Sequence, residues 1–599
     1  MKNVLSKDPS PYLQQHKNNP VHWQTWSKDS LNQAKTQKKP ILLSVGYSSC
    51  HWCHVMAHES FEDKTTADLM NEFFINIKVD REERPDLDFV FQSSFQLFNQ
   101  SGGGWPLTMF LDENGVPFMG GTYFPKDEKH GLPAFKTILQ KVHEAYVDQR
   151  TKIIEQKNLI KKNLELKKTN VIGQEPEPIL QNILNNLDEK NGGFKGAPKF
   201  PTFYVFDTLL YFYNKNKNPK YLKPVELILK KLCSKGIYDH VEGGISRYTV
   251  DENWLIPHFE KMLYDNVQFI LLLTKFLKIK PNKYFLKKVK QTTNFLLKDF
   301  ISKDTNLLGS AFDADSEGVE GKYYVFSYEE LKDIKDINLF FNIKPEGNWE
   351  GKIILDELKE PTREIINQLL EIRSKRKKPF FDNKTQLDLN CIWVSSLVYL
   401  NSIMPDKDYL KTAENFYERI EKKFCNDNIF HSYSEDISFI EDYSYLIQCL
   451  LDLSDTTMNP KYRLLAKKYC DEAIEKFYDD NCKVFQKNEK RKNDIFMNPI
   501  DISDNTLPNA NSVMLMNFCR LGYKDQAKEL SDSLNGYLNI YKNFMTSSLK
   551  ALDFFKEINN GKNCNTEAKR TISYIFVRFF GHKWHTSFVY IRFTCYNSN

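Results

Sequence analysis

The residues with the clearest chemical potential are two cysteines spaced as C-x-x-C, Cys50 and Cys53. They follow an apolar run, Ile41–Val45, that predicts a buried strand, and they stand at the start of a helix expected from His51 to about Glu72. A thiol at a helix N-terminus lies near unpaired backbone N–H groups and the positive end of the helix dipole, which stabilise the thiolate. The sequence therefore predicts Cys50 as the attacking nucleophile and Cys53 as the resolving thiol of a redox pair.

Two further residues complete the predicted catalytic set. His51 stands between the cysteines and, when protonated, would favour the Cys50 thiolate further. Pro106 precedes a predicted strand, Leu107–Leu111. In a thioredoxin-like fold a cis proline at such a position faces the active cysteines, and only an X–Pro bond reaches the cis form at about 0.5–1 kcal/mol. A proline that merely begins the strand is the alternative interpretation.

Other interpretations of the cysteine pair stay open. Cys50, Cys53 and His54 match the C-x-x-C-H pattern of haem attachment, but the first twenty residues do not resemble a signal peptide for export. A structural zinc site needs about four ligands, and there is no second C-x-x-C in the sequence. His54 and His58, four residues apart on the expected helix, would be the partners of a Cys/His site. A non-catalytic pair is a further alternative. We expect no metal and no cofactor.

Composition excludes several classes of protein. Among 599 residues, 83 Lys and Arg balance 78 Asp and Glu, a net charge of +5 that suits neither nucleic acid nor an anionic membrane surface. Eleven cysteines are too few for a secreted disulfide scaffold. The most apolar windows, Val267–Ile279 and Cys391–Met404, are too short to span a bilayer and predict buried helices. We expect a cytoplasmic protein, and we interpret the basic cluster Arg373–Lys378 as a solvated helix end.

The pattern of elements predicts a multidomain chain. Residues 1–158 alternate helical and strand signals and predict an α/β domain of the thioredoxin-like class. Residues 159–178 are polar, end in Glu-Pro-Glu-Pro and predict a linker. Residues 179–558 repeat amphipathic helices and predict an all-α region, either a closed toroid of helical hairpins or an open solenoid. Residues 559–599 lose this periodicity, which indicates an atypical tail from truncation or a shifted reading frame.

The helical region contains loops rich in acidic, basic and aromatic residues. Such a mixture is typical of a carbohydrate site, where ring faces stack on sugars and carboxylates perform acid and base chemistry. The candidate substrate-binding residues are Asp239, His240, Arg247, Trp254, His258, Glu260 and Asp265. Each could instead cap a helix end. A further acidic cluster, Asp313-Ala314-Asp315, could be an ordinary Asx turn.

These motifs together resemble the thioredoxin-domain-containing family of the spermatogenesis-associated protein 20 type. GYSSCHWCHVMAHESFED, KVDREERPDLD, GGWPLTMFL, GGTYFP, GGFKGAPKFP and WLIPHFEKMLYDN match its pattern in order, from residue 5 to about 555. The resemblance implies a thioredoxin-like domain followed by an (α/α)6 toroid like that of six-hairpin glycosidases. It also implies that Cys50 and Cys53 form the redox motif and that Pro106 is the cis proline. Asp388-Leu389-Asn390-Cys391 departs from the usual Asp-Trp-Asn-Gly, which weakens the case for sugar turnover.

The predicted function is thiol–disulfide exchange at Cys50 and Cys53, with the helical domain recognising a protein thiol or disulfide partner. The alternative is a carbohydrate-active enzyme or sugar-binding protein, with His258 and Glu260 as the acid and base. A non-catalytic scaffold is the third hypothesis.

Overall fold

The structure is a computed structural model that describes residues 2–100, 102–129, 131–167, 175–426, 428–433, 437–491 and 494–560. The chain up to Phe555 forms one unit. The predicted atypical tail lies outside the described residues from position 561 onward.

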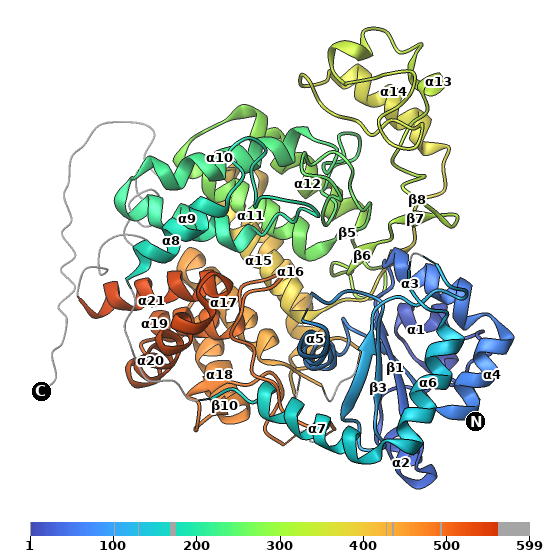
Figure 1. Ribbon diagram of the computed structural model, residues 1–599. Helices are drawn as coiled ribbons and strands as arrows, with labels where there is room; N and C mark the ends of the chain where they lie inside the picture. Colours follow the sequence, from blue (N-terminus) through green and yellow to red (C-terminus); the bar gives the residue numbers. More distant parts are fainter. Residues whose placement is uncertain are drawn as a thin grey trace, which may run out of the picture. The chain divides into compact units, whose positions relative to one another are not determined.

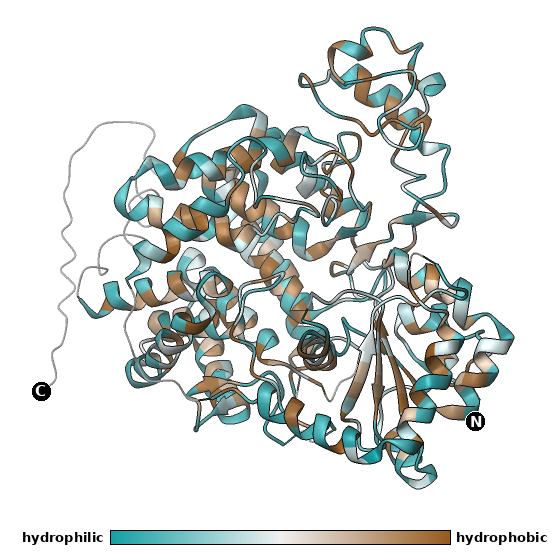
Figure 2. Ribbon diagram, viewed as in Figure 1, coloured by the Kyte–Doolittle hydropathy of each residue, from teal (hydrophilic) through white to brown (hydrophobic). Residues whose placement is uncertain are grey.

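The N-terminal domain is built on a four-stranded sheet in the order β2-β1-β3-β4. The strands are β1 (Ile41–Gly46), β2 (Ile75–Asp80), β3 (Leu107–Leu111) and β4 (Pro117–Gly121). β1 pairs parallel with β2 and antiparallel with β3, and β3 pairs antiparallel with β4. β1, β2 and β3 are buried throughout. Figure 2 shows brown, hydrophobic residues along this sheet, as expected for strands that are covered on both faces.

Helices cover both faces of this sheet. The helices are α1 (Pro11–Gln15), α2 (Lys28–Gln37), α3 (His51–Met56), α4 (Lys64–Phe73), α5 (Pro85–Asn99), α6 (Phe135–Asp148) and α7 (Arg150–Leu164). Leu43 and Val45 point into a core with α2 and α5, whereas Leu42 and Phe110 point into a core with α3, α4 and α6. This alternation along β1 follows from the two-residue period of a strand. The architecture confirms the predicted thioredoxin-like class.

The helix expected from His51 to Glu72 is interrupted. α3 passes into a wide turn at Ala57–Phe61, and α4 begins afresh after Asp63. The Asp63 carboxylate accepts from the Thr66 backbone N–H at 2.9 Å and so caps a new helix. Periodicity alone missed this cap because the apolar positions continue across the break. The Asp112–Gly115 turn joins β3 to β4.

The helical domain is a ring of inner and outer helices. The inner helices are α9 (Phe203–Asn216), α11 (Leu263–Ile279), α15 (Leu387–Asn401), α17 (Ile440–Thr457), α19 (Ala510–Leu521) and α21 (Thr546–Asn559). The outer helices are α8 (Pro176–Asn186), α10 (Pro219–Ser234), α12 (Lys283–Asp299), α16 (Tyr409–Phe424), α18 (Pro460–Phe477) and α20 (Lys524–Tyr541). The two windows that are too short for a membrane span are the buried inner helices α11 and α15. None of the helices in the described part of the chain combines the length and apolar character needed to cross a membrane.

The ring closes on itself, which decides between a toroid and an open solenoid. Ser512 of α19 and Ser548 of α21 share a hydrogen bond of 2.7 Å. Asp553 of α21 then pairs with Lys215 of α9 at 2.6 Å. The last inner helix therefore contacts the first, and the region is an (α/α)6 toroid. Each outer helix runs back antiparallel to the inner helix before it, so the inner helices are parallel to one another. Their N-termini therefore lie at the same end of the ring, which we call the mouth of the toroid.

A long excursion between α12 and α15 supplies loops at this mouth. It contains α13 (Tyr328–Leu331), α14 (Arg363–Ser374) and a hairpin of β7 (Asp315–Ser316) and β8 (Val319–Glu320). β6 (Ala311–Phe312) pairs with β5 (Lys261–Met262) and β9 (Phe381–Asp382). Figure 1 shows β7 and β8 next to α3, the helix that begins at the cysteine pair.

Candidate functional site

The two cysteines form a disulfide at the N-terminus of α3. β1 delivers the chain to Gly46, a four-residue loop follows, and Cys50 caps the helix by accepting the Cys53 backbone N–H at 3.2 Å. Cys50 is 3% exposed and Cys53 is 1% exposed. The pair is therefore placed as a thiolate site should be, but it is covered in this state.

Pro106 lies beside the same loop. The Trp105–Pro106 peptide bond is cis, as the sequence predicts. β3 begins directly after it and pairs with β1 at Val45 and Leu107, so Pro106 stands opposite the end of β1. The Trp105 ring meets the Tyr47 ring edge-on, with centroids 5.8 Å apart.

Acidic side chains of the toroid hold the histidines of the redox motif. His51 Nδ1 lies 2.9 Å from Asp315 Oδ1, and His54 Nε2 lies 3.0 Å from Asp313 Oδ2. Burial by itself would lower the pKa of each histidine, but the hydrogen bond and charge of its aspartate outweigh burial and raise the pKa. The acidic cluster Asp313-Ala314-Asp315, which could be read as an ordinary turn, thus contacts the helix that carries the cysteine pair. It also forms the expected Asx turn, since Asp313 accepts from the Asp315 N–H.

A second contact covers the loop before Cys50. Arg247 Nη1 donates to Tyr47 Oη at 2.6 Å and pairs with Glu260 Oε1 at 3.1 Å. Tyr47 also donates to Glu260 at 3.2 Å, and Ser49 lies 3.4 Å from the other Glu260 oxygen. The Arg247 guanidinium lies 5.2 Å from the Trp105 ring centroid, within cation–π range. The toroid therefore touches both the cysteine loop and the residue before the cis proline.

A buried lysine ties the two domains together. Lys384 Nζ pairs with Asp80 at 2.7 Å and Glu82 at 2.9 Å in the N-terminal domain, and with Asp382 at 3.1 Å in the toroid. Burial would lower the pKa of Lys384, but the surrounding carboxylates raise it well above its usual value. Ser48 hydrogen-bonds Asp382, which brings this ionic cluster to the cysteine loop.

The segment after β2 closes the mouth of the toroid. Its Glu82 carbonyl accepts from His431 Nε2 at 2.8 Å, and its Glu82 carboxylate accepts from Ser310 at 2.8 Å. Further along, Asp86 accepts from Asn488 at 2.9 Å. The N-terminal domain thus occupies the end of the ring where the inner helices begin.

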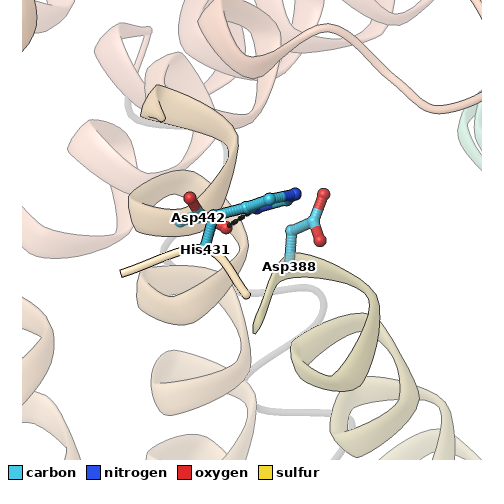
Figure 3. A group of neighbouring side chains, drawn as sticks. All are labelled: Asp388, His431 and Asp442. Atoms are coloured by element: carbon cyan, nitrogen blue, oxygen red, sulfur yellow. Dashed lines mark hydrogen bonds and ion pairs between the residues drawn. The ribbon is translucent and has the colours of Figure 1, made fainter. Parts of the chain in front are cut away.

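His431 lies between two aspartates, Asp388 and Asp442, as Figure 3 shows. Its Nδ1 lies 2.8 Å from Asp442 Oδ1, and its Nε2 donates a hydrogen bond to the Glu82 carbonyl. Burial would lower the pKa of His431, but Asp442 raises it to about 10. Burial raises the pKa of Asp388 to about 7. With both ring nitrogens bearing protons toward acceptors, His431 acts as a buried cation rather than as a metal ligand.

The predicted sugar-binding residues fall into two groups. Asp239 pairs with Arg373 at 2.7 Å and with Lys261 at 2.7 Å, and His240 pairs with Glu357 at 3.0 Å. The cavity beside them has a volume of about 30 Å³, far below the roughly 300 Å³ of a typical ligand pocket. The interpretation of the basic cluster Arg373–Lys378 as a solvated helix end is wrong for Arg373, which is 2% exposed. Counting charges along the sequence missed its buried partner, Asp239.

Trp254 is fully buried and donates to the Asn191 carbonyl at 2.9 Å, so it offers no exposed ring face for stacking. The second group is Arg247, His258 and Glu260, and it lies next to the loop that leads from β1 to Cys50. His258 pairs with Glu320 of β8 at 2.6 Å.

Asp265 lies in the first turn of α11, and burial raises its pKa well above the usual range.

Sequence reasoning missed the contacts that join the two domains. Asp382 contacts Ser48 and Glu320 contacts His51, on either side of Cys50. Tyr47 bonds Glu260, and Lys384 pairs with Asp382. The available signal was the run of acidic and basic residues directly after β2, because charges that follow a buried strand lie at the same sheet edge as the cysteines.

Comparisons with known proteins agree with this architecture. The family model Thioredox_DsbH, described as a protein of unknown function, DUF255, matches residues 2–165. The uncharacterized protein B0495.5 of Caenorhabditis elegans is 32% identical over 594 residues, covering 87% of this chain and 80% of that protein. Spermatogenesis-associated protein 20 of Homo sapiens is 28% identical over 604 residues, covering 87% of this chain and 77% of that protein.

Among solved structures, the cellobiose 2-epimerase from Spirochaeta thermophila aligns with 64% of this chain and 94% of its own, at 12% identity and a TM-score of 0.43. The length and identity of the sequence matches, together with the domain order, show that this chain belongs to the spermatogenesis-associated protein 20 family.

Proposed function

We propose that the chain performs thiol–disulfide exchange through Cys50 and Cys53, with the toroid as the module that covers the pair and admits its partner. The observation that carries the proposal is the disulfide between these cysteines at the start of α3, next to His51. The thioredoxin-like domain and its family match support the same chemistry.

The exchange would follow the usual two displacements. In the reduced protein the Cys50 thiolate attacks one sulfur of a partner disulfide, and the other partner sulfur leaves as a thiolate that takes up a proton. The Cys53 thiolate then attacks Cys50 Sγ. The Cys50–Cys53 bond forms, the bond to the partner breaks, and the second partner sulfur leaves. The partner is reduced by two electrons and the cysteine pair is oxidised. The reverse sequence oxidises a dithiol partner.

A partner can reach the cysteine pair only when the toroid residues that cover it move away from the N-terminal domain. Cys50 is 3% exposed, beneath the contacts of His51 with Asp315 and of Tyr47 with Glu260. A protein disulfide cannot approach the sulfur in line while these contacts persist. We therefore infer that the toroid controls which partners reach Cys50, and we propose a protein thiol or disulfide as that partner.

The proposal is tested by trapping. In a Cys53→Ser variant of the full chain, Cys50 should accumulate mixed disulfides that disappear on addition of reductant. Cys482→Ser, which removes a half-buried cysteine of the toroid, is the matched control and should trap nothing. The proposal fails if no partner is trapped and the wild-type pair neither oxidises nor reduces between about −300 and −120 mV.

Carbohydrate binding by the toroid has less support from the geometry. Asp239, His240 and Trp254 are engaged by internal partners, and the remaining candidates face the cysteine loop. A saccharide bound at 100 times its Kd would stabilise the protein by about 2.7 kcal/mol, so a thermal-shift panel of mono- and disaccharides would reveal it.

A further inference from the structure

A buried tyrosine hydroxyl lies beside the resolving cysteine. Tyr12 of α1 is fully buried, and its Oη has no hydrogen-bond partner among the described residues. A Cβ added to Gly46, at the end of β1, would overlap this oxygen and stand 2.8 Å from Cys53 Sγ. The hydroxyl oxygen and the sulfur therefore border one small space, which the missing side chain of Gly46 leaves open.

The surrounding residues hold the Tyr12 ring in place. Ser10 caps α1 by accepting from the Leu13 N–H, and its hydroxyl donates to Asp80 Oδ2 at 2.6 Å. The His16 ring packs edge-on against Tyr12 with centroids 5.1 Å apart, and Lys78 Nζ lies 5.1 Å from the Tyr12 ring centroid. The hydroxyl cannot turn to solvent without moving the whole of α1.

An unpartnered buried hydroxyl has to be explained, because it costs about 1–3 kcal/mol relative to a hydrogen-bonded one. In the oxidised protein its neighbour is a disulfide sulfur, which is a poor acceptor. Reduction converts that sulfur into a thiol or thiolate, and a thiolate accepts a charge-assisted hydrogen bond, which is roughly twice as strong as a neutral one. The hydroxyl is thus unsatisfied in the oxidised state and has a suitable acceptor in the reduced state.

We propose that the Tyr12 hydroxyl donates a hydrogen bond to Cys53 Sγ in the reduced protein and stabilises the thiolate that attacks Cys50. Tyr12 is then a catalytic residue of the resolving step. The electrons move as in the exchange described above, and Tyr12 keeps its proton throughout. This inference rests on the proposed thiol–disulfide exchange. Since the bond forms only after reduction, it favours the reduced pair and makes the protein a stronger oxidant.

The first test measures the dithiol–disulfide equilibrium of the full chain in glutathione redox buffers. Tyr12→Phe removes one oxygen and should shift this equilibrium about tenfold toward the disulfide, a reduction potential about 30 mV more negative. Ser10→Ala keeps the Tyr12 hydroxyl but removes the hydrogen bond that ties α1 to Asp80. It should therefore give a smaller shift of the equilibrium in the same direction. Tyr537→Phe is the control, because it removes the hydroxyl of another fully buried tyrosine, in α20 of the toroid, and should leave the equilibrium unchanged.

The second test titrates Cys53 directly. In a Cys50→Ser background the pH dependence of Cys53 alkylation reports its pKa, which Tyr12→Phe should raise by about one unit. If the wild-type pair exchanges with the buffer but Tyr12→Phe changes neither the equilibrium nor this titration, the role of Tyr12 is overturned and the proposed function stands. If the wild-type pair does not exchange at all, the proposed function fails, and the Cys53 titration alone decides whether Tyr12 bonds the sulfur.

Discussion

His51, between the two cysteines, is hydrogen-bonded through Nδ1 to Asp315, a residue 264 positions later in the chain, at 2.9 Å. Burial alone would lower the pKa of His51, and the aspartate raises it above its ordinary value. A carboxylate of the toroid thereby favours the protonated form of the histidine next to Cys50. Cysteine chemistry in one domain is coupled to a carboxylate in the other.

Asp315→Asn should weaken the Cys50 thiolate. Without the carboxylate, the hydrogen bond and charge that raise the pKa of His51 are lost, so the pKa falls and a smaller share of the rings beside Cys50 is protonated. We expect the pKa of Cys50 to rise by about half to one unit, measured as the pH dependence of its alkylation in a Cys53→Ser background. Asp313→Asn, which acts on His54 one turn further along α3, is the matched control and should move the Cys50 titration less. Equal shifts in both variants would contradict a specific role for Asp315.

Thermal stability should depend on pH through the histidines at the cover. His51, His54 and His258 all have raised pKa values, because in each case an acidic partner from the toroid outweighs burial. Protons bind more tightly to the folded protein at these sites, so their contribution to stability is complete below about pH 6.5 and is lost as the pH rises through the folded pKa.

A variant that combines Asp315→Asn with Glu320→Gln tests this pH dependence. The Tm difference between wild type and variant should be largest near pH 5.5 and should shrink toward pH 9. A difference that stays constant or grows over this range would refute the assignment.

Asp442→Asn and Asp388→Asn should have opposite consequences although both aspartates approach His431. Asp442 balances a buried cation, so its loss leaves that charge uncompensated and should cost about 3 kcal/mol of the free energy of unfolding. Asp388 has a pKa raised by burial to about 7, so at pH 8 its replacement by the neutral amide should be near neutral or stabilising. Urea unfolding at pH 8 measures both. A large loss of unfolding free energy in Asp388→Asn but not in Asp442→Asn would show that Asp388, and not Asp442, balances the charge of His431.

Lys384→Met should release the two domains from each other. The variant leaves Asp80, Glu82 and Asp382 without their shared buried cation, and we expect a loss of about 3–5 kcal/mol of unfolding free energy. The cysteine pair should also be reduced faster by a phosphine, because Ser48 loses the anchoring of Asp382. Lys332→Met, which breaks an exposed pair within one helical turn, is the control and should change neither quantity. Unchanged reduction in Lys384→Met would show that this cluster does not hold the cover closed.

Much of the N-terminal site could be predicted because it is local. The strand Ile41–Gly46, the start of a helix at His51 and the cysteine spacing lie within thirteen consecutive residues. A continuous apolar run, helix capping and the preference of thiolates for helix N-termini act over that distance. The helical periodicity after residue 175 likewise predicts a stack of hairpins.

The sequence by itself located the C-x-x-C pair at the start of a helix, singled out Pro106 as the candidate cis proline and indicated the class of each domain, because these follow from short-range patterns. Only the tertiary structure decided that the ring closes through the ion pair of Asp553 with Lys215 and that Asp315 hydrogen-bonds His51. It also decided that the Tyr12 hydroxyl and Cys53 border the same space beside Gly46. Such pairings depend on how separate elements pack, and charge or periodicity along the chain leaves them open. Asp239 shows the same limit: its type suggested a sugar ligand, and its burial beside Arg373 and Lys261 assigns it to an internal ion pair.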